Sequence, residues 1–143
     1  MNPFLLSSSE RLAHWRQFRA SLVGLLEIDR LAAVTAFWAN APLSVVDVRP
    51  RPPWPTIWQM LHANIWTRDS VAVGMEATLR LIGVAADRMT LRCISLVPDE
   101  LLVLVIDETW LLNYDWGSFR LYTTVDHSIL GQWRFIGKDY RLI

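Results

Sequence analysis

The chain has 143 residues with no formal net charge at pH 7, and 52% of its residues are hydrophobic against 20% that are charged. This length and composition fit one folded domain and exclude a disordered chain, while the balanced charge gives no electrostatic case for binding nucleic acid or a membrane surface. The only cysteine, Cys93, excludes an internal disulfide. Because the three histidines are dispersed and no acidic cluster stands out, we predict no metal and no cofactor.

The N-terminal 41 residues predict two amphipathic helices. The first spans about residues 10–26 behind three serines that can cap it, and its apolar residues keep helical spacing. Asp29 can cap the second helix, which Pro42 ends. Neither helix, nor the apolar run at residues 101–106, is long enough to cross a bilayer, and the chain start lacks the features of a secretory signal. We therefore expect a soluble protein made in a reducing compartment.

Residues 42–55 form a proline-rich strap, with four prolines in its last six residues. Proline at this density forbids a helix and favours a stiff, extended connection. Too little chain lies on either side to make two cores, so we interpret the strap as a surface segment. A single domain over residues 1–143 then consists of a helical part (1–41), the strap, and a helix-plus-sheet core (56–143).

Two more helices follow the strap. Pro55 suits the first turn of the third helix, whose apolar stripe is Ile57, Trp58, Leu61 and Ile65. The fourth helix has Asp69 or Ser70 as its cap and Gly83 as its terminator. Its inward residues are predicted to be Val71, Met75, Thr78, Leu79 and Ile82. Gly74 costs this helix about 1 kcal/mol relative to alanine, which predicts a close backbone contact there.

After Gly83 the pattern changes to short β-rich segments separated by turn residues. Tight turns at 97–100 and 107–109 predict an antiparallel meander of three strands within residues 88–115, packed on the fourth helix. Further segments follow at 118–124 and in a terminal hairpin at 129–143. The order predicts an α+β fold with N-terminal helices packed on a C-terminal antiparallel β-sheet.

The run ELLVLVIDETWLLNYDWG, residues 100–117, resembles the strand–turn–strand of transglutaminase-like and papain-like cysteine enzymes. In that family a helix-borne Cys, a strand His and a following Asp or Asn form the triad, and the resemblance implies Asp115 as the third member. It covers about residues 70–117, and no thiol stands at the helix start nor a histidine at the start of the strand. We interpret Thr67, Ser70 and Asp115 as positions of a degenerate site with no catalytic residues, and we predict that the protein is not an enzyme.

Two other nucleophiles remain open as an alternative. Ser70 with Asp115 would need a histidine, and the spacing of the three histidines does not bring one to them. Cys93 shares a strand face with apolar residues, which is typical of a small core residue, although a reactive thiol stays possible in principle.

Five of the eight tryptophans fall into two groups. Trp15, Trp38 and Trp58 fall on apolar helix stripes and are predicted to lie in the core. Trp54 lies in the strap near Arg49 and Arg51, and Trp116 lies in a loop. Because a stiff loop loses little entropy on docking, we predict that these four residues, Arg49, Arg51, Trp54 and Trp116, bind a partner. A tryptophan at position 54 could equally fasten the strap to its own domain.

A second resemblance spans most of the chain. The segments FWANAPL, WPTIWQMLH, SVAVGMEATLRL and LLNYD resemble small uncharacterised proteins of tailed-phage genomes, in which a cysteine tends to occur near the position of Thr67. This resemblance implies a phage-encoded, non-catalytic structural or assembly protein, present in the virion or in the host cytoplasm during assembly. Its partners would be other virion proteins in a symmetric oligomer or larger complex. The alternatives are a transglutaminase-like hydrolase or acyltransferase, and an inhibitor of a host protein.

Overall fold

The computed structural model describes residues 2–44 and 51–143. Four α-helices come first in the chain, and a six-stranded sheet follows. The helices are α1 (Ser8–Leu22), α2 (Glu27–Trp38), α3 (Ile57–Ala63) and α4 (Arg68–Leu81). The strands are β1 (Met89–Leu96), β2 (Asp99–Ile106), β3 (Trp110–Leu112), β4 (Phe119–Leu121), β5 (Ser128–Ile136) and β6 (Asp139–Leu142). Short 3₁₀ turns lie at Pro3–Leu5, Ala86–Arg88 and Tyr122–Thr124.

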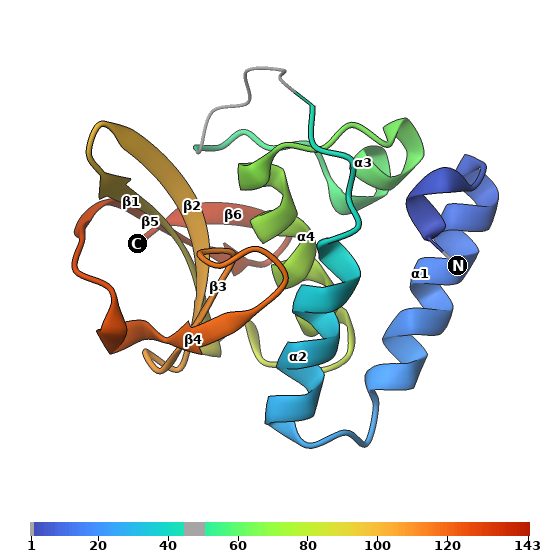
Figure 1. Cartoon of the computed structure of the whole chain (residues 1–143), viewed down its shortest axis with the longest axis horizontal. Coiled ribbons are helices and arrows are strands. Elements are labelled where there is room, and N and C mark those ends of the chain that lie inside the picture. The colour runs from blue at the N-terminus through green and yellow to red at the C-terminus, as the bar shows by residue number, and fades with distance from the viewer. Residues whose placement is uncertain (1, 45–50) are drawn as a thin grey trace.

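Helix α4 lies at the centre of the molecule. One side of it contacts β1 and β2, and its other sides contact α1, α2 and α3 (Figure 1). All of its residues from Ser70 to Leu79 are buried, which explains why its sequence is apolar beyond a single stripe. The predicted α+β fold, with N-terminal helices packed on a C-terminal antiparallel sheet, is confirmed.

The sheet has the strand order β4-β3-β2-β1-β5-β6, and every neighbouring pair is antiparallel. The predicted meander of β1, β2 and β3 is confirmed, with Cys93 opposite Leu102 in the first pair. Side chains alternate across this sheet, so Leu91 and Cys93 face the helices and the main core. The opposite face carries a second small core, formed by Ile94, Leu101, Val103, Val105 and Leu111.

Helix boundaries differ from the sequence-based prediction in three places. Helix α1 ends at Leu22, so Leu26 lies in the exposed connection and is the N-cap of α2. Asp29, the predicted cap, lies in the first turn of α2. Helix α3 ends at Ala63, one residue before Asn64 adopts a left-handed conformation, so Ile65 leaves the stripe and is exposed.

The tryptophans that were predicted to be core residues divide in the structure. Trp15 and Trp38 are fully buried, and the indole N–H of each donates a hydrogen bond to Thr78 Oγ1, at 3.1 and 3.2 Å. Trp58 was wrongly predicted to be in the core, because 46% of its surface is exposed. The close approach predicted at Gly74 is confirmed, since a Cβ atom there would lie 2.7 Å from Trp38 Cη2.

Within the described ranges, no helix combines the length and apolarity needed to span a bilayer. The predicted β-like run before the prolines lies mostly within residues 45–50, outside the described residues. Leu43, just before them, forms an isolated parallel bridge with Trp66.

Candidate functional site

Helix α4 begins with a capping box in which both hydroxyls are already used. Thr67, rather than the predicted Asp69 or Ser70, is the N-cap, and its Oγ1 accepts from the Ser70 N–H at 3.1 Å. In return Ser70 Oγ accepts from the Thr67 N–H at 2.8 Å and donates to the Thr67 carbonyl at 3.1 Å. Both residues therefore stabilise the helix start.

Helix α4, strand β2 and the end of β3 meet at four residues, Arg68, Asp69, Leu102 and Asn113, which we call the α4–β2–β3 junction. Asp69 Oδ1 accepts a hydrogen bond from the Leu102 N–H at 2.8 Å. Asn113 Nδ2 donates to the carbonyls of Arg68 and Leu102 at 2.7 and 2.9 Å. A terminal nitrogen of Arg68 donates to the Asn113 carbonyl at 3.0 Å. Side chain and backbone groups of all three elements are thus bonded to one another.

Burial affects the ionisation of Asp69 and the hydrogen bonding of Asn113 at this junction. Desolvation raises the pKa of the Asp69 carboxyl, and the hydrogen bond from Leu102 opposes that rise. Asn113 is completely buried, and its Oδ1 has no hydrogen-bond partner among the described residues. The side chains that the helix start and the two strands bring to this junction are a guanidinium, a carboxylate, an apolar group and an amide.

Asp115, the residue implied as a third triad member, lies away from this contact. Its carboxylate oxygens accept hydrogen bonds from Arg120, both at 2.6 Å. The residue that reaches the start of α4 is Asn113, which the sequence analysis missed. Its only sequence signal was an amide directly after the apolar run of β3.

Cys93 and Ser70 are poor nucleophiles in this environment. Burial, and to a lesser extent the nearby Glu100 carboxylate, raise the pKa of the Cys93 thiol to about 11. The Sγ atom lies 3.8 Å from Glu100 Oε2 and is therefore a thiol at neutral pH. Hydrogen bonds within residues 2–44 and 51–143 connect neither Cys93 nor Ser70 to a histidine.

The residues predicted to bind a partner lie in three different settings. Arg49 lies outside the described residues, and Arg51 is exposed with its guanidinium 3.9 Å from Glu100. Trp116 is 38% exposed, and the Arg68 guanidinium lies 5.2 Å from its ring centroid. Trp54 packs edge-on against Trp133 and Tyr140, with ring centroids 5.6 and 5.2 Å away. Trp54 thus fastens the strap to its own domain, while partner binding by these residues stays a prediction.

A cavity of about 500 Å³ lies at the other end of α4. It is enclosed by residues 52–55 of the strap, the start of α3, the last turns of α4 and the β5–β6 hairpin, and we call it the strap cavity. Its walls include Trp54, Trp58, Phe135 and Tyr140, and Arg80 and Lys138 bring positive charge to it. The sequence analysis did not foresee this cavity.

A buried carboxylate lies beside the strap cavity. Glu76 accepts hydrogen bonds from Arg80 Nε at 3.2 Å and from the Tyr140 hydroxyl at 2.7 Å. Desolvation raises the pKa of the Glu76 carboxyl, and the Arg80 charge only partly offsets this rise. Burial and the neighbouring Glu76 also raise the pKa of the Tyr140 phenol. These three side chains connect α4 to β6.

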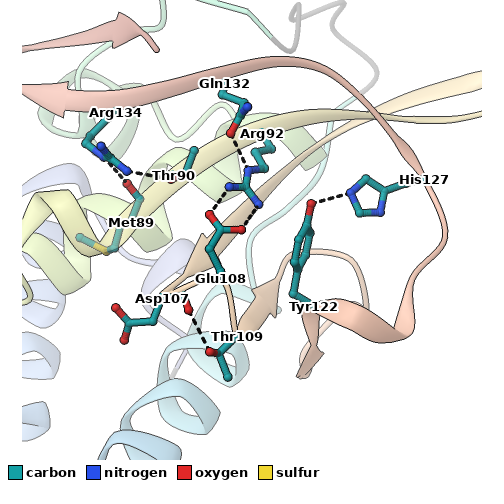
Figure 2. Close-up of polar contacts among 10 residues, drawn as sticks. All are labelled: Met89, Thr90, Arg92, Asp107, Glu108, Thr109, Tyr122, His127, Gln132 and Arg134. Atoms are coloured by element: carbon teal, nitrogen blue, oxygen red, sulfur yellow. Dashed lines mark hydrogen bonds and ion pairs between the residues drawn. The ribbon is translucent and has the colours of Figure 1, made fainter.

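The face of the sheet away from the helices carries a second polar cluster (Figure 2). Arg92 on β1 pairs with the Glu108 carboxylate and donates to Gln132 Oε1 at 2.8 Å. Alongside, His127 Nε2 lies 2.6 Å from the Tyr122 hydroxyl, and its Nδ1 lies 2.9 Å from the Val125 carbonyl. These contacts hold the β4–β5 connection over the second small core, which gives the cluster a structural role.

Metal binding finds no support in the described part of the chain, where no three His, Cys, Asp or Glu side chains gather closely enough to hold an ion.

Comparison with known proteins gives a fold relationship. No protein-family model and no curated protein matches the chain. Three solved structures of Legionella pneumophila LapG are similar in fold, each at 14% sequence identity. The calcium-bound form has a TM-score of 0.75 over 96% of this chain and 80% of LapG. Another LapG structure and the EGTA-treated form each have a TM-score of 0.78 over 91% of this chain, covering 76% and 75% of LapG.

This relationship corrects the functional hypothesis drawn from the sequence. The fold neighbours are structures of LapG, a transglutaminase-like cysteine protease, and not phage structural or assembly proteins. The four segments that suggested a phage protein lie on or directly beside α2, α3, α4 and β3, and none of the comparisons supports a phage origin.

Proposed function

We propose that this chain is a ligand-binding domain on a transglutaminase-like fold, and that it does not cleave or transfer acyl groups through a thiol. One observation carries the proposal. Where α4, β2 and β3 meet, the chain supplies Asp69, Leu102 and Asn113, which are already bonded to one another. Thiol catalysis needs a nucleophile and a proton-accepting base, and a leucine side chain cannot accept a proton.

The competing candidate is a transglutaminase-like hydrolase, which the fold likeness to LapG favours. It would need a substitute nucleophile. The Ser70 hydroxyl already forms hydrogen bonds in the capping box, and Cys93 is buried with a raised thiol pKa. Neither has the neighbouring imidazole that activates such groups. The chemistry of the site therefore favours binding over hydrolysis.

The binding half of the proposal depends on the strap cavity. Its volume, about 500 Å³, lies within the usual range of small-ligand sites, and it combines aromatic walls with a few charged groups. It lies at the opposite end of α4 from the junction, so the loss of a triad leaves it intact.

The test is a cleavage assay on an unstructured protein substrate and a mixed peptide library, read by mass spectrometry. The proteins are the wild type and three variants, Ser70→Ala, Cys93→Ala and Asp69→Asn, each checked for folding by circular dichroism. We expect no cleavage by the wild type. Cleavage that any one of the folded variants loses would establish the hydrolase instead and refute the proposal.

A further inference from the structure

We propose that the strap cavity binds a monocarboxylate carrying an aromatic or branched apolar group, and that Arg80 receives the carboxylate. This inference rests on the proposed function in one respect, namely that the chain binds its ligand without cleaving it. It adds the site, the anchoring residue and the chemical class of the ligand.

The aromatic walls of the strap cavity indicate that part of the ligand is apolar. Trp58 packs one edge against Trp15, with ring centroids 5.3 Å apart, yet 46% of its surface remains exposed. Phe135 and Tyr140 complete the opposite wall, 5.2 Å apart and nearly perpendicular. An apolar group placed between these walls removes aromatic surface from water, which is the main source of affinity in such sites.

The position and bonding of Arg80 indicate that the ligand carries a carboxylate. Its Nε donates to both oxygens of Glu76 at 3.2 Å, and its guanidinium carbon lies 3.5 Å from the Phe135 ring centroid. Among the hydrogen bonds of residues 2–44 and 51–143, none uses its two terminal nitrogens, and the side chain is 20% exposed. A guanidinium held over an aromatic ring, with two terminal nitrogens that make no hydrogen bond among these residues, matches the two oxygens of a carboxylate.

The charge balance around the cavity favours an anion over an amine. Arg80 and Lys138 line it, against the single carboxylate of Asp139. Glu76 offsets part of the Arg80 charge from the buried side, but its side chain is 3% exposed and already accepts from Arg80 and Tyr140, so it is shielded from a ligand ammonium in the cavity. A ligand ammonium would also have to displace Arg80 from the face of Phe135.

A carboxylate beside a single apolar group is the chemistry of a free aromatic or branched-chain acid, and equally that of the last residue of a peptide. An internal peptide segment has no such carboxylate. The two sources share the anchor at Arg80 and differ only in what extends out of the cavity.

The test compares N-acetylphenylalanine with its amide, titrated into the wild-type protein and followed by tryptophan fluorescence and by NMR of the indole N–H signals. We expect the acid to bind about tenfold more tightly than the amide or better, because a hydrogen-bonded charge pair contributes that much. Equal binding of acid and amide overturns the inference, as does the absence of binding by both at millimolar concentration.

Substitutions of two arginines test whether Arg80 is the residue that binds the carboxylate. Arg80→Gln should remove the preference for the acid, while Arg141→Gln, an exposed arginine of β6 outside the cavity, should keep it. If Arg80→Gln fails to fold because Glu76 loses its partner, the double variant Glu76→Gln/Arg80→Gln removes both charges and serves instead. An undiminished preference for the acid in a folded variant without Arg80 overturns the assignment.

The tetrapeptide Ala-Ala-Ala-Phe and its C-terminal amide distinguish the two sources. Tighter binding of the tetrapeptide than of N-acetylphenylalanine identifies a peptide C-terminus, equal binding identifies the free acid, and both results support the anion site. Cleavage of the tetrapeptide in the same samples would refute the proposed function. If the wild type shows no preference for the acid and no cleavage, only this inference is refuted.

Discussion

The two ends of helix α4 show opposite uses of polar side chains. At its start, the α4–β2–β3 junction joins Asp69 to Leu102 and Asn113 to two backbone carbonyls. At its last turn, Arg80 donates hydrogen bonds to Glu76 through Nε, and its side chain lines the strap cavity. At the start of α4 the polar side chains form hydrogen bonds within the fold. At its last turn, Arg80 has terminal nitrogens that form no hydrogen bond among the described residues.

The largest expected loss of stability comes from a substitution in the α4–β2–β3 junction. Replacing Asn113 by alanine removes two hydrogen bonds and leaves the buried Leu102 carbonyl without the donor that Asn113 supplies, while the Arg68 carbonyl remains part of the first turn of α4. We expect a loss of about 3 kcal/mol in the free energy of unfolding, measured by urea denaturation. The control is Asp115→Ala, which removes an ion pair to Arg120 at the surface and should change stability little. A larger loss for Asp115→Ala than for Asn113→Ala would contradict the assignment of Asn113.

An intermediate effect is expected at the wall of the strap cavity. Trp54→Ala removes the edge-on contacts with Trp133 and Tyr140, and we expect a loss of about 2 kcal/mol. Trp116→Ala should cost less than about 1 kcal/mol, because Trp116 is 38% exposed. Thermal melting of the two variants measures this difference. Equal melting temperatures would mean that the strap is not held by Trp54.

The smallest expected effect is a dependence of stability on pH, which compares a buried carboxylate at each end of α4. The carboxyl pKa values of Glu76 and Asp69 are raised in the folded protein, mainly by burial. Ionising either group therefore costs more in the fold than in the unfolded chain, so its contribution lowers stability as pH rises from the ordinary value towards the raised folded pKa.

Glu76→Gln and Asp69→Asn should each flatten this decline, measured by thermal melting from pH 3 to 7 in steps of about half a unit. Asp107 and Glu108 contribute with the opposite sign, since hydrogen bonds from Arg88 and Arg92 lower their carboxyl pKa values. They are present in every variant, so the difference between variant and wild type is the readout. A wild-type profile that neither variant alters would contradict the burial argument.

Much of the fold was predictable because its signals are local. Period-two alternation and the turns at 97–100 and 107–109 predicted the antiparallel meander, and the glycine at position 74 predicted a close contact that Trp38 provides. The buried thiol of Cys93 followed from its place on the apolar face of β1. Each of these inferences needs only neighbouring residues and the geometry of one element.

The site depended on contacts that no local pattern contains. Asn113 and Asp115 stand two residues apart, and only the end of β3 decides that Asn113 turns towards α4 while Asp115 pairs with Arg120. Trp58 kept helical spacing but is half exposed, because α3 ends early and faces a cavity. Sequence alone therefore determined the elements, their faces and the absence of a cysteine at the start of α4. Only the tertiary structure decided which polar groups bond to each other, because Tyr140, which donates to Glu76, and Leu102, which donates to Asp69, lie in strands 64 and 33 residues further along the chain.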